Sequence, residues 1–149
     1  MFRAKKSLGQ NSLTAKGVVL DIVGTAEIKK GESVLEIGPG KGILTEALLS
    51  AGAQVFAVEK DERMVLLLQK KFANEIKSGQ LELISGDVLR LNAKRYTLTT
   101  GSYKLVANIP YNITGEILRK FIGGSAKPSR AVLLVQKEVA ERVVEKDGK

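Results

Sequence analysis

Five short hydrophobic runs recur along the chain, and polar or helix-patterned segments separate them. The runs are 33–37 (SVLEI), 54–59 (QVFAVE), 81–85 (LELIS), 103–107 (YKLVA) and 130–135 (RAVLLV). Their apolar positions are mostly continuous rather than alternating, which is typical of parallel strands covered on both faces. We therefore predict that these five runs form a parallel sheet.

Helical spacing of apolar residues appears in four further segments. They are 14–26, with Thr14 as a possible cap, then 41–52, 61–79 and 136–146. Strands that alternate with helices in this way predict one α/β domain over residues 1–149, built as a doubly wound parallel sheet. In such a sheet ligands bind beyond the carboxyl ends of the strands, so the residues that follow each strand are the candidates for function.

Composition removes several classes of chemistry. The chain of 149 residues contains no cysteine and no histidine. Disulfides, thiolate metal sites and histidine acid–base catalysis are therefore excluded, and we expect no metal site. No apolar run approaches the ~20 residues of a membrane span, and the first residues lack the apolar core of a signal peptide. These features favour a soluble, cytoplasmic protein.

The charge balance favours a polyanionic partner. The formal net charge is +8, from 24 basic and 16 acidic side chains. Such an excess suits nucleic acid, although a basic surface kept for solubility is the alternative. Three bases, Arg3, Lys5 and Lys6, lie on an N-terminal arm (residues 1–13) with few apolar residues to fold it. We predict that these three side chains bind RNA.

A glycine-rich loop follows the first predicted strand. In LEIGPGKG the glycines are Gly38, Gly40 and Gly42, and glycine lets a backbone turn tightly and approach a ligand. A dinucleotide fingerprint would place its third glycine at position 43, which is Ile43. Glu36 would repel a pyrophosphate and would suit a cationic ligand such as S-adenosylmethionine. A tight strand–helix turn without any ligand is the alternative.

Acidic residues follow the next two predicted strands. Glu59 can accept hydrogen bonds from both ribose hydroxyls of an adenosine, which fits NAD as well as S-adenosylmethionine. Asp87 can accept from an adenine amino group while Val88 packs on the ring. Taken singly, Glu59 could be a solvated charge and Gly-Asp an ordinary turn. Taken together, the three strand ends are expected to line one crevice.

The fourth predicted strand ends in the tetrad Asn108-Ile109-Pro110-Tyr111. An adenine amine is a poor nucleophile, because its lone pair is delocalised into the ring. The Asn108 amide oxygen and the Ile109 carbonyl can accept its two hydrogens, which directs the lone pair toward a methyl donor. Pro110 holds the turn and Tyr111 offers a face for base stacking. The alternative is an Asn-x-Pro turn with an incidental tyrosine.

Six motifs in this order resemble the KsgA family, the ribosomal RNA adenine N6,N6-dimethyltransferases. They are KKSLGQNSL, VLEIGPGKGILTEALL, VFAVEKDERM, GDVL, VANIPYNIT and LLVQKEVAERVV, and they cover nearly the whole chain. The resemblance implies a Rossmann-like, S-adenosylmethionine-dependent methyltransferase fold followed by a small helical domain. It implies a role in ribosome biogenesis, with two adjacent adenosines of a 3′-terminal hairpin of small-subunit (16S) rRNA as substrate and the immature 30S subunit as partner.

The resemblance also assigns site residues by matching motif. It assigns cofactor binding to Gln10, Asn11, Leu13, Gly38, Gly40, Glu59, Lys60, Asp87, Val88 and Asn108, and the target base to Asn108, Ile109, Pro110 and Tyr111. Ser12 departs from the family, which usually has phenylalanine there. The chain ends after the fifth predicted strand and one helix, so we expect a truncated domain without the helical domain, with an exposed sheet edge and little activity by itself.

Three other functions remain open at this point. A resistance-type methyltransferase of large-subunit rRNA shares N-I-P-Y, although the L-G-Q-N arm favours the small-subunit enzyme. A non-catalytic RNA-binding assembly factor could retain the same fold. A nicotinamide-dependent oxidoreductase agrees least, because the glycine spacing differs. For the rRNA methyltransferase that the resemblance implies, we expect a monomer.

Overall fold

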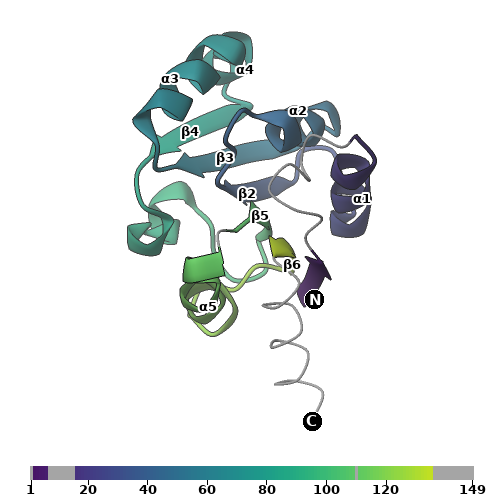
Figure 1. Cartoon of the computed structure of the whole chain (residues 1–149), viewed down its shortest axis with the longest axis vertical. Helices are drawn as coiled ribbons and strands as arrows, with labels where there is room; N and C mark the ends of the chain where they lie inside the picture. The colour runs from purple at the N-terminus through teal and green to yellow at the C-terminus, as the bar shows by residue number, and fades with distance from the viewer. Residues whose placement is uncertain (1, 7–15, 110, 136–149) are drawn as a thin grey trace.

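A single parallel sheet of six strands organises the computed structural model, which describes residues 2–6, 16–109 and 111–135 (Figure 1). In spatial order the strands are β1-β6-β5-β2-β3-β4. Their bounds are β1 Phe2–Lys6, β2 Ser33–Ile37, β3 Gln54–Glu59, β4 Leu81–Ser85, β5 Tyr103–Asn108 and β6 Arg130–Val135. All five predicted strands are confirmed, and β5 is one residue longer than predicted.

The sixth strand corrects the prediction for the N-terminal arm. Residues 2–6 form β1, which pairs in parallel with β6 from Phe2 opposite Ala131 to Lys6 opposite Val135. The edge of the fifth predicted strand is therefore covered, and the prediction of an exposed edge there is wrong. The physical reason is that an edge strand presents free N–H and C=O groups, which a backbone of almost any sequence can pair with.

Both faces of the sheet are covered, as the continuous apolar runs predict. Helices α1 (Lys16–Ala26), α2 (Ile43–Ser50), α3 (Glu62–Lys71) and α4 (Ala73–Ser78) lie along one face. The other face carries short helical turns, namely η2 (Val88–Arg90), η3 (Ala93–Tyr96), η4 (Tyr111–Ile113), α5 (Thr114–Ile117) and η5 (Leu118–Ile122). Side chains of successive residues in a strand point to opposite faces of the sheet. Val34 packs in the hydrophobic core beneath α1 to α4, and Leu35 packs in the core beneath the short helical turns.

The segment 61–79, predicted as one helix, is two helices. The break falls at Phe72, whose backbone dihedrals are φ −113° and ψ 32°. Hydrogen bonds of helical type continue on both sides, from the Phe72 N–H to the Leu68 carbonyl and from the Ile76 N–H to the Phe72 carbonyl. The apolar spacing runs through the break, so the pattern alone could not reveal it. The buried Phe72 ring packs beneath the glycine loop.

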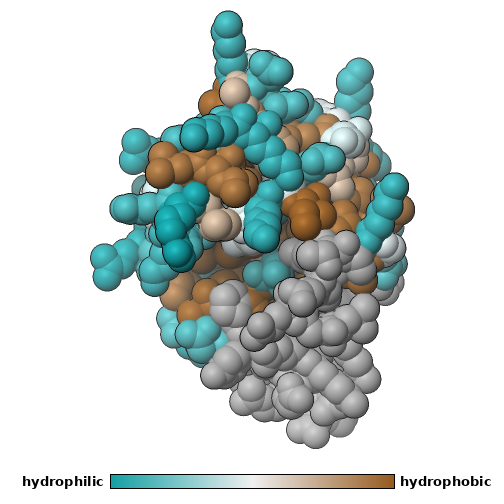
Figure 2. Space-filling model, turned by 45° about the horizontal axis from the view of Figure 1, so that its top comes forward, coloured by the Kyte–Doolittle hydropathy of each residue, from teal (hydrophilic) through white to brown (hydrophobic). Residues whose placement is uncertain are grey.

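Figure 2 shows hydrophilic side chains projecting from the described surface, with hydrophobic areas between them. Among the described residues the exposed large hydrophobic side chains are Leu20, Leu66 and Leu67. None of the helices that the structure describes combines the length and apolar character that crossing a bilayer requires.

Candidate functional site

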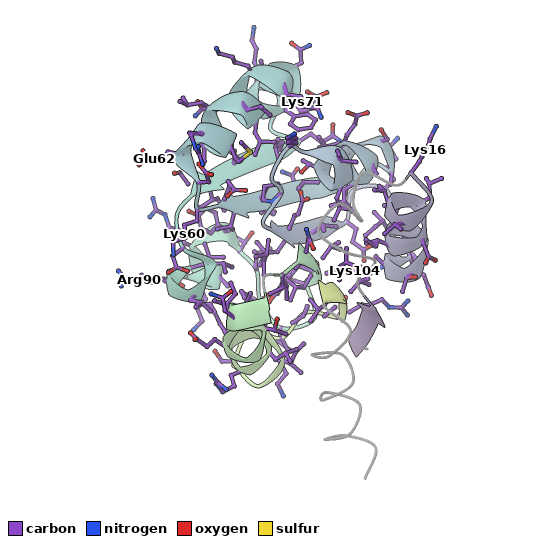
Figure 3. The ribbon with its side chains drawn as sticks, viewed as in Figure 1. Lys16, Lys60, Glu62, Lys71, Arg90 and Lys104 are labelled. Carbon is purple, nitrogen blue, oxygen red and sulfur yellow. The ribbon has the colours of Figure 1, made fainter. Side chains whose placement is uncertain are left out.

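The carboxyl ends of four neighbouring strands meet at one edge of the sheet. Strand β2 lies between β5 and β3, so its end is the point at which the strand order reverses. Ile37, the last residue of β2, is level with Ala107 on β5 and Val58 on β3. The residues that follow these positions are therefore neighbours in space, as expected at the ligand site of a doubly wound sheet. Lys60 and Glu62 mark this edge in Figure 3.

Gly38 and Asn108 are in close contact at this edge. The Gly38 N–H donates to the Val58 carbonyl at 3.0 Å, and Gly38 has φ +70°. A Cβ atom at Gly38 would lie 3.2 Å from the Asn108 backbone oxygen. The positive φ favours glycine at this position, and a side chain there would also press against the backbone of the neighbouring strand β5. The half-buried Asn108 thus lies beside the first glycine of the loop.

Glu59 is oriented by two backbone donors. Its Oε1 accepts from the Gly40 N–H at 3.0 Å and its Oε2 accepts from the Asp61 N–H at 2.9 Å. A carboxylate oxygen has two acceptor sites, so each oxygen retains one for a ligand hydroxyl. Gly40 has φ +56°, and a Cβ placed there would meet no described atom within 4 Å. We name Gly38, Gly40, Glu59 and Asn108 the strand-end site.

The third glycine of the loop has a packing role. Gly42 has φ +88°, and a Cβ there would lie 2.7 Å from Phe72 Cε2 and 2.8 Å from Leu68 Cδ2. Gly42 therefore lets α3 pack closely against the start of α2. The G-x-G-x-G spacing does not distinguish this glycine from Gly38 and Gly40, whereas the structure does.

Glu36 is a buried acid rather than a surface charge. Its side chain is 1% exposed, and Thr45 Oγ1 donates to its Oε1 at 2.5 Å. Burial raises the pKa of Glu36 from 4.5 to about 8; the hydrogen bond from Thr45 opposes the shift and the charge of Glu59 adds to it. Glu36 is mostly protonated at neutral pH. The raised pKa does not support the interpretation that a negative charge on Glu36 selects a cationic ligand, and that interpretation stays a prediction.

Removing the Glu36 proton is expected to destabilise the fold. Between pH 4.5 and about 8 the folded chain holds a proton that the unfolded chain releases, so the free energy of unfolding falls as pH rises. The full loss, as pH passes through this window, is about 5 kcal/mol. Glu36→Gln keeps an acceptor for Thr45 but does not titrate. Urea unfolding from pH 5 to 9 should show a much flatter pH dependence for this variant.

Glu82→Gln is the matched control, because Glu82 is exposed. Its unfolding free energy should follow that of the unsubstituted chain at every pH. Parallel pH profiles for the unsubstituted chain and Glu36→Gln would contradict the neutral-acid assignment.

Asp87 and Val88 lie at the end of β4, beside the strand-end site. The Gly86 N–H donates to the Glu59 carbonyl at 2.9 Å, which ties this turn to β3. Asp87 Oδ1 accepts from the Leu89 N–H at 2.9 Å, so this carboxylate caps η2. Val88 is only 5% exposed and packs in the core. The assignment of both residues to an adenine ring stays a prediction.

The remaining predicted site residues are described to different extents. Ile109 is buried, and its N–H donates to the Leu134 carbonyl at 3.2 Å, while Lys60 is exposed. For Arg3, Lys5, Lys6 and Tyr111 the structure places the backbone, in β1 and η4 respectively. Outside the described residues lie Pro110, Gln10, Asn11, Leu13 and the helix predicted at 136–146.

The sequence interpretation missed Thr45, the partner of Glu36. Thr45 is fully buried on α2, and its position on the apolar side of that helix was the available indication. Within 2–6, 16–109 and 111–135, no group of three or more Asp or Glu side chains is arranged to hold a metal ion.

The comparison with protein families gives one match over the whole chain. The family model described as ribosomal RNA adenine dimethylase matches residues 1–149. The chain is 41% identical over 146 residues to a ribosomal RNA small subunit methyltransferase A of Dehalococcoides mccartyi, covering 98% of this chain and 49% of the relative. It is 42% identical over 153 residues to the protein of that name from Thermosynechococcus vestitus, covering 99% and 55%. The chain spans about half the length of these curated relatives.

Solved structures give the same fold. The 23S rRNA methyltransferase ErmE superposes with a TM-score of 0.74 at 27% identity, over 91% of this chain and 52% of that one. A dimethyladenosine transferase from Plasmodium falciparum superposes with a TM-score of 0.71 at 33% identity, over 87% and 45%. These matches confirm the predicted methyltransferase fold.

Proposed function

Because this chain belongs to the ribosomal RNA adenine dimethylase family, we propose that it transfers methyl groups from S-adenosylmethionine to N6 of two adjacent adenosines. The proposed substrate is the 3′-terminal hairpin of small-subunit (16S) rRNA in the immature 30S subunit. The observation that carries the proposal is the contact between Gly38 and Asn108, since it joins the cofactor loop to the target-base motif. Such an activity belongs to ribosome biogenesis in the cytoplasm.

The strand-end site fits the cofactor. Glu59 retains acceptor sites for ribose hydroxyls, and the backbone at Gly40 is open to a ligand. Burial raises the pKa of Glu36 and so favours its neutral form next to the loop. When bound, S-adenosylmethionine supplies an electrophilic methyl group on its sulfonium. We assign the methionine part to Gly38 and Gly40 and the ribose to Glu59 and Lys60.

The chain's own residues orient the adenine amine. Asn108 Oδ1 and the Ile109 carbonyl accept its two hydrogens, which points the nitrogen lone pair at the methyl group. The hydrogen bond from the Ile109 N–H to Leu134 fixes this turn against β6. The new N–C bond would form as the bond between the methyl group and the sulfonium sulfur breaks. The amine proton becomes acidic in this step and can be lost to solvent, so no strong base is required. This agrees with a chain that has no histidine.

The choice of rRNA is the finer part of the proposal. The curated relatives named above are small-subunit enzymes, whereas ErmE, whose fold is similar, acts on 23S rRNA according to its name. The higher identity to the small-subunit enzymes favours the 16S substrate. Primer extension on both rRNAs from a deletion strain would separate the two: a lost stop in 23S rRNA alone would overturn this choice.

We propose further that this 149-residue chain is a monomer that binds the cofactor. We also propose that it transfers few methyl groups by itself, because its curated relatives are about twice as long. Robust dimethylation by the isolated chain would contradict this. A non-catalytic assembly factor on the same fold is the remaining rival. It would be favoured if Tyr111→Ala left ribosome assembly intact and no methyl mark existed.

Calorimetric titration of the chain with S-adenosylmethionine tests the proposal directly. We expect one site per chain and no binding of NAD. Gly40→Ala should weaken cofactor binding at least about tenfold, because the added methyl group enters the ligand position and strains the backbone. Measuring the dissociation constants of both chains checks this.

Gly101→Ala is the matched control for Gly40→Ala. Gly101 also has a positive φ of +79°, and a Cβ there would also meet no described atom within 4 Å. It precedes β5 and therefore lies at the opposite end of the sheet. If both substitutions weakened binding equally, backbone strain and not ligand contact would explain the loss.

A further inference from the structure

The positive charge of the chain is concentrated in one stretch. Residues 88–129 contain a single acidic side chain, Glu116, and the bases Arg90, Lys94, Arg95, Lys104, Arg119, Lys120 and Lys127. Lys104 differs from the other bases because it is buried and forms an ion pair within the protein. It is 7% exposed, and its Nζ lies 3.0 Å from Glu32 Oε1. We name the other six bases the basic face.

Five of the six bases of this face lie on two segments that pack together, and Lys127 lies in the loop between η5 and β6. Arg90, Lys94 and Arg95 lie on η2 and η3, whereas Arg119 and Lys120 lie on η5. Lys120 Nζ donates to the Leu89 carbonyl at 3.0 Å and to the Leu91 carbonyl at 2.8 Å, which joins η5 to η2. Both segments cover the same face of the sheet, opposite the layer of α1 to α4.

The charges of this face are not neutralised by the protein. Five of its six bases are exposed and Lys120 is half-buried. None of the six forms an ion pair with another residue in the part of the chain that the structure describes. By contrast, Lys71 of α3 pairs with Glu46, and Arg130 pairs with Glu27. Figure 3 shows Arg90 projecting outward on the same side as Lys60.

A cavity of about 420 Å³ lies within the basic face. Its polar lining comes from Asn92, Lys94, Lys120 and Ser125. An ammonium group has three N–H donors, and Lys120 uses two of them on backbone carbonyls, which leaves one. Asn92 Oδ1 accepts from the Lys94 N–H, so the NH₂ group of Asn92 remains a donor. The cavity therefore presents donors and positive charge, which is what a phosphate group requires.

We infer that the basic face binds the phosphate backbone of the RNA substrate, with one phosphate in the cavity. Both segments begin beside or at the strand-end site: η2 follows Asp87, next to the site at the end of β4, and η4, α5 and η5 follow Asn108 at the end of β5. An RNA that places an adenine at Asn108 would therefore pass over this layer. The inference rests on the proposed function. It identifies the surface that binds the parts of the RNA on either side of the reacting base.

Matched triple substitutions test this surface. The test variant is Arg90→Gln, Lys94→Gln and Arg119→Gln; the control is Lys16→Gln, Lys70→Gln and Lys77→Gln, which removes equal charge from exposed positions on the helix layer. Lys120 is kept because it joins η5 to η2. The affinity of the full-length protein for a synthetic RNA hairpin with two adjacent adenosines is measured at several salt concentrations, and cofactor affinity is measured in parallel.

The test variant should bind the hairpin on the order of tenfold more weakly, and its salt dependence should lose about one phosphate contact per substitution. The control should change much less, and both should bind S-adenosylmethionine normally. Equal losses in test and control variants would overturn the inference while leaving the proposed function intact. No hairpin binding by the unsubstituted protein would overturn both. Should the test variant lose cofactor binding, Lys94→Glu alone, at an exposed position, repeats the comparison with Lys70→Glu.

Discussion

Replacing Asn108 with alanine in the full-length protein is expected to abolish methyl transfer and to leave much of the affinity for S-adenosylmethionine. Asn108 ends β5 with its backbone beside Gly38, and the turn that starts at Ile109 follows it directly. Without the amide oxygen, one amine hydrogen loses its acceptor and the lone pair is no longer directed at the methyl group. Loss of one such positioned group lowers kcat by about 100- to 1000-fold.

Asn74→Ala is the control for this substitution. Asn74 is the same residue type, and it is exposed on α4 in the helix layer, away from the target-base motif. Its turnover should stay within about twofold of the unsubstituted enzyme, because surface substitutions away from a site have small effects. Turnover is measured by transfer of a labelled methyl group to the rRNA hairpin, and cofactor affinity by calorimetry. Near-normal turnover by Asn108→Ala would refute the assigned mechanism.

The strands could be predicted from the sequence because each is covered on both faces. A strand buried on both sides is a short, continuous apolar run, and such runs gave the bounds of β2, β3, β4 and β6 without error. The parallel order then placed the residues after these strands at one edge. For this reason Gly38, Glu59 and Asn108 could be brought together before any coordinates were known.

The features that were missed depend on contacts that the residue types do not encode. Strand β1 pairs through its backbone with an edge, so its polar sequence gave no strand pattern. The break at Phe72 is a change in both backbone dihedral angles of one residue inside an unbroken apolar stripe. The charge of Glu36 depends on its burial against Thr45 and Glu59, which the motif LEIGPGKG does not reveal.

Replacing Glu59 with glutamine is expected to weaken S-adenosylmethionine binding by about 100-fold. Both carboxylate oxygens of Glu59 already accept backbone hydrogen bonds, from Gly40 and Asp61, and both are needed again for the ribose hydroxyls. A glutamine offers one oxygen and one NH₂ group, so one backbone donor and one hydroxyl lose their acceptor. Hydrogen bonds to a charged group contribute about 1.5–3 kcal/mol each, and 1.4 kcal/mol corresponds to tenfold in affinity.

The affinities for two ligands that differ only in one ribose hydroxyl show whether Glu59 contacts the ribose directly or only keeps the loop in shape. The unsubstituted chain should bind S-adenosylhomocysteine about tenfold more tightly than its 2′-deoxy analogue, whereas Glu59→Gln should bind the two almost equally. Glu62→Gln removes an exposed acid from the same edge of the sheet, and it should keep the preference for the hydroxyl (Figure 3). If Glu59→Gln lost affinity for both ligands but kept their ratio, Glu59 would act only by holding Gly40 and Asp61 in place. The ribose would then have to be bound by another residue at this edge of the sheet.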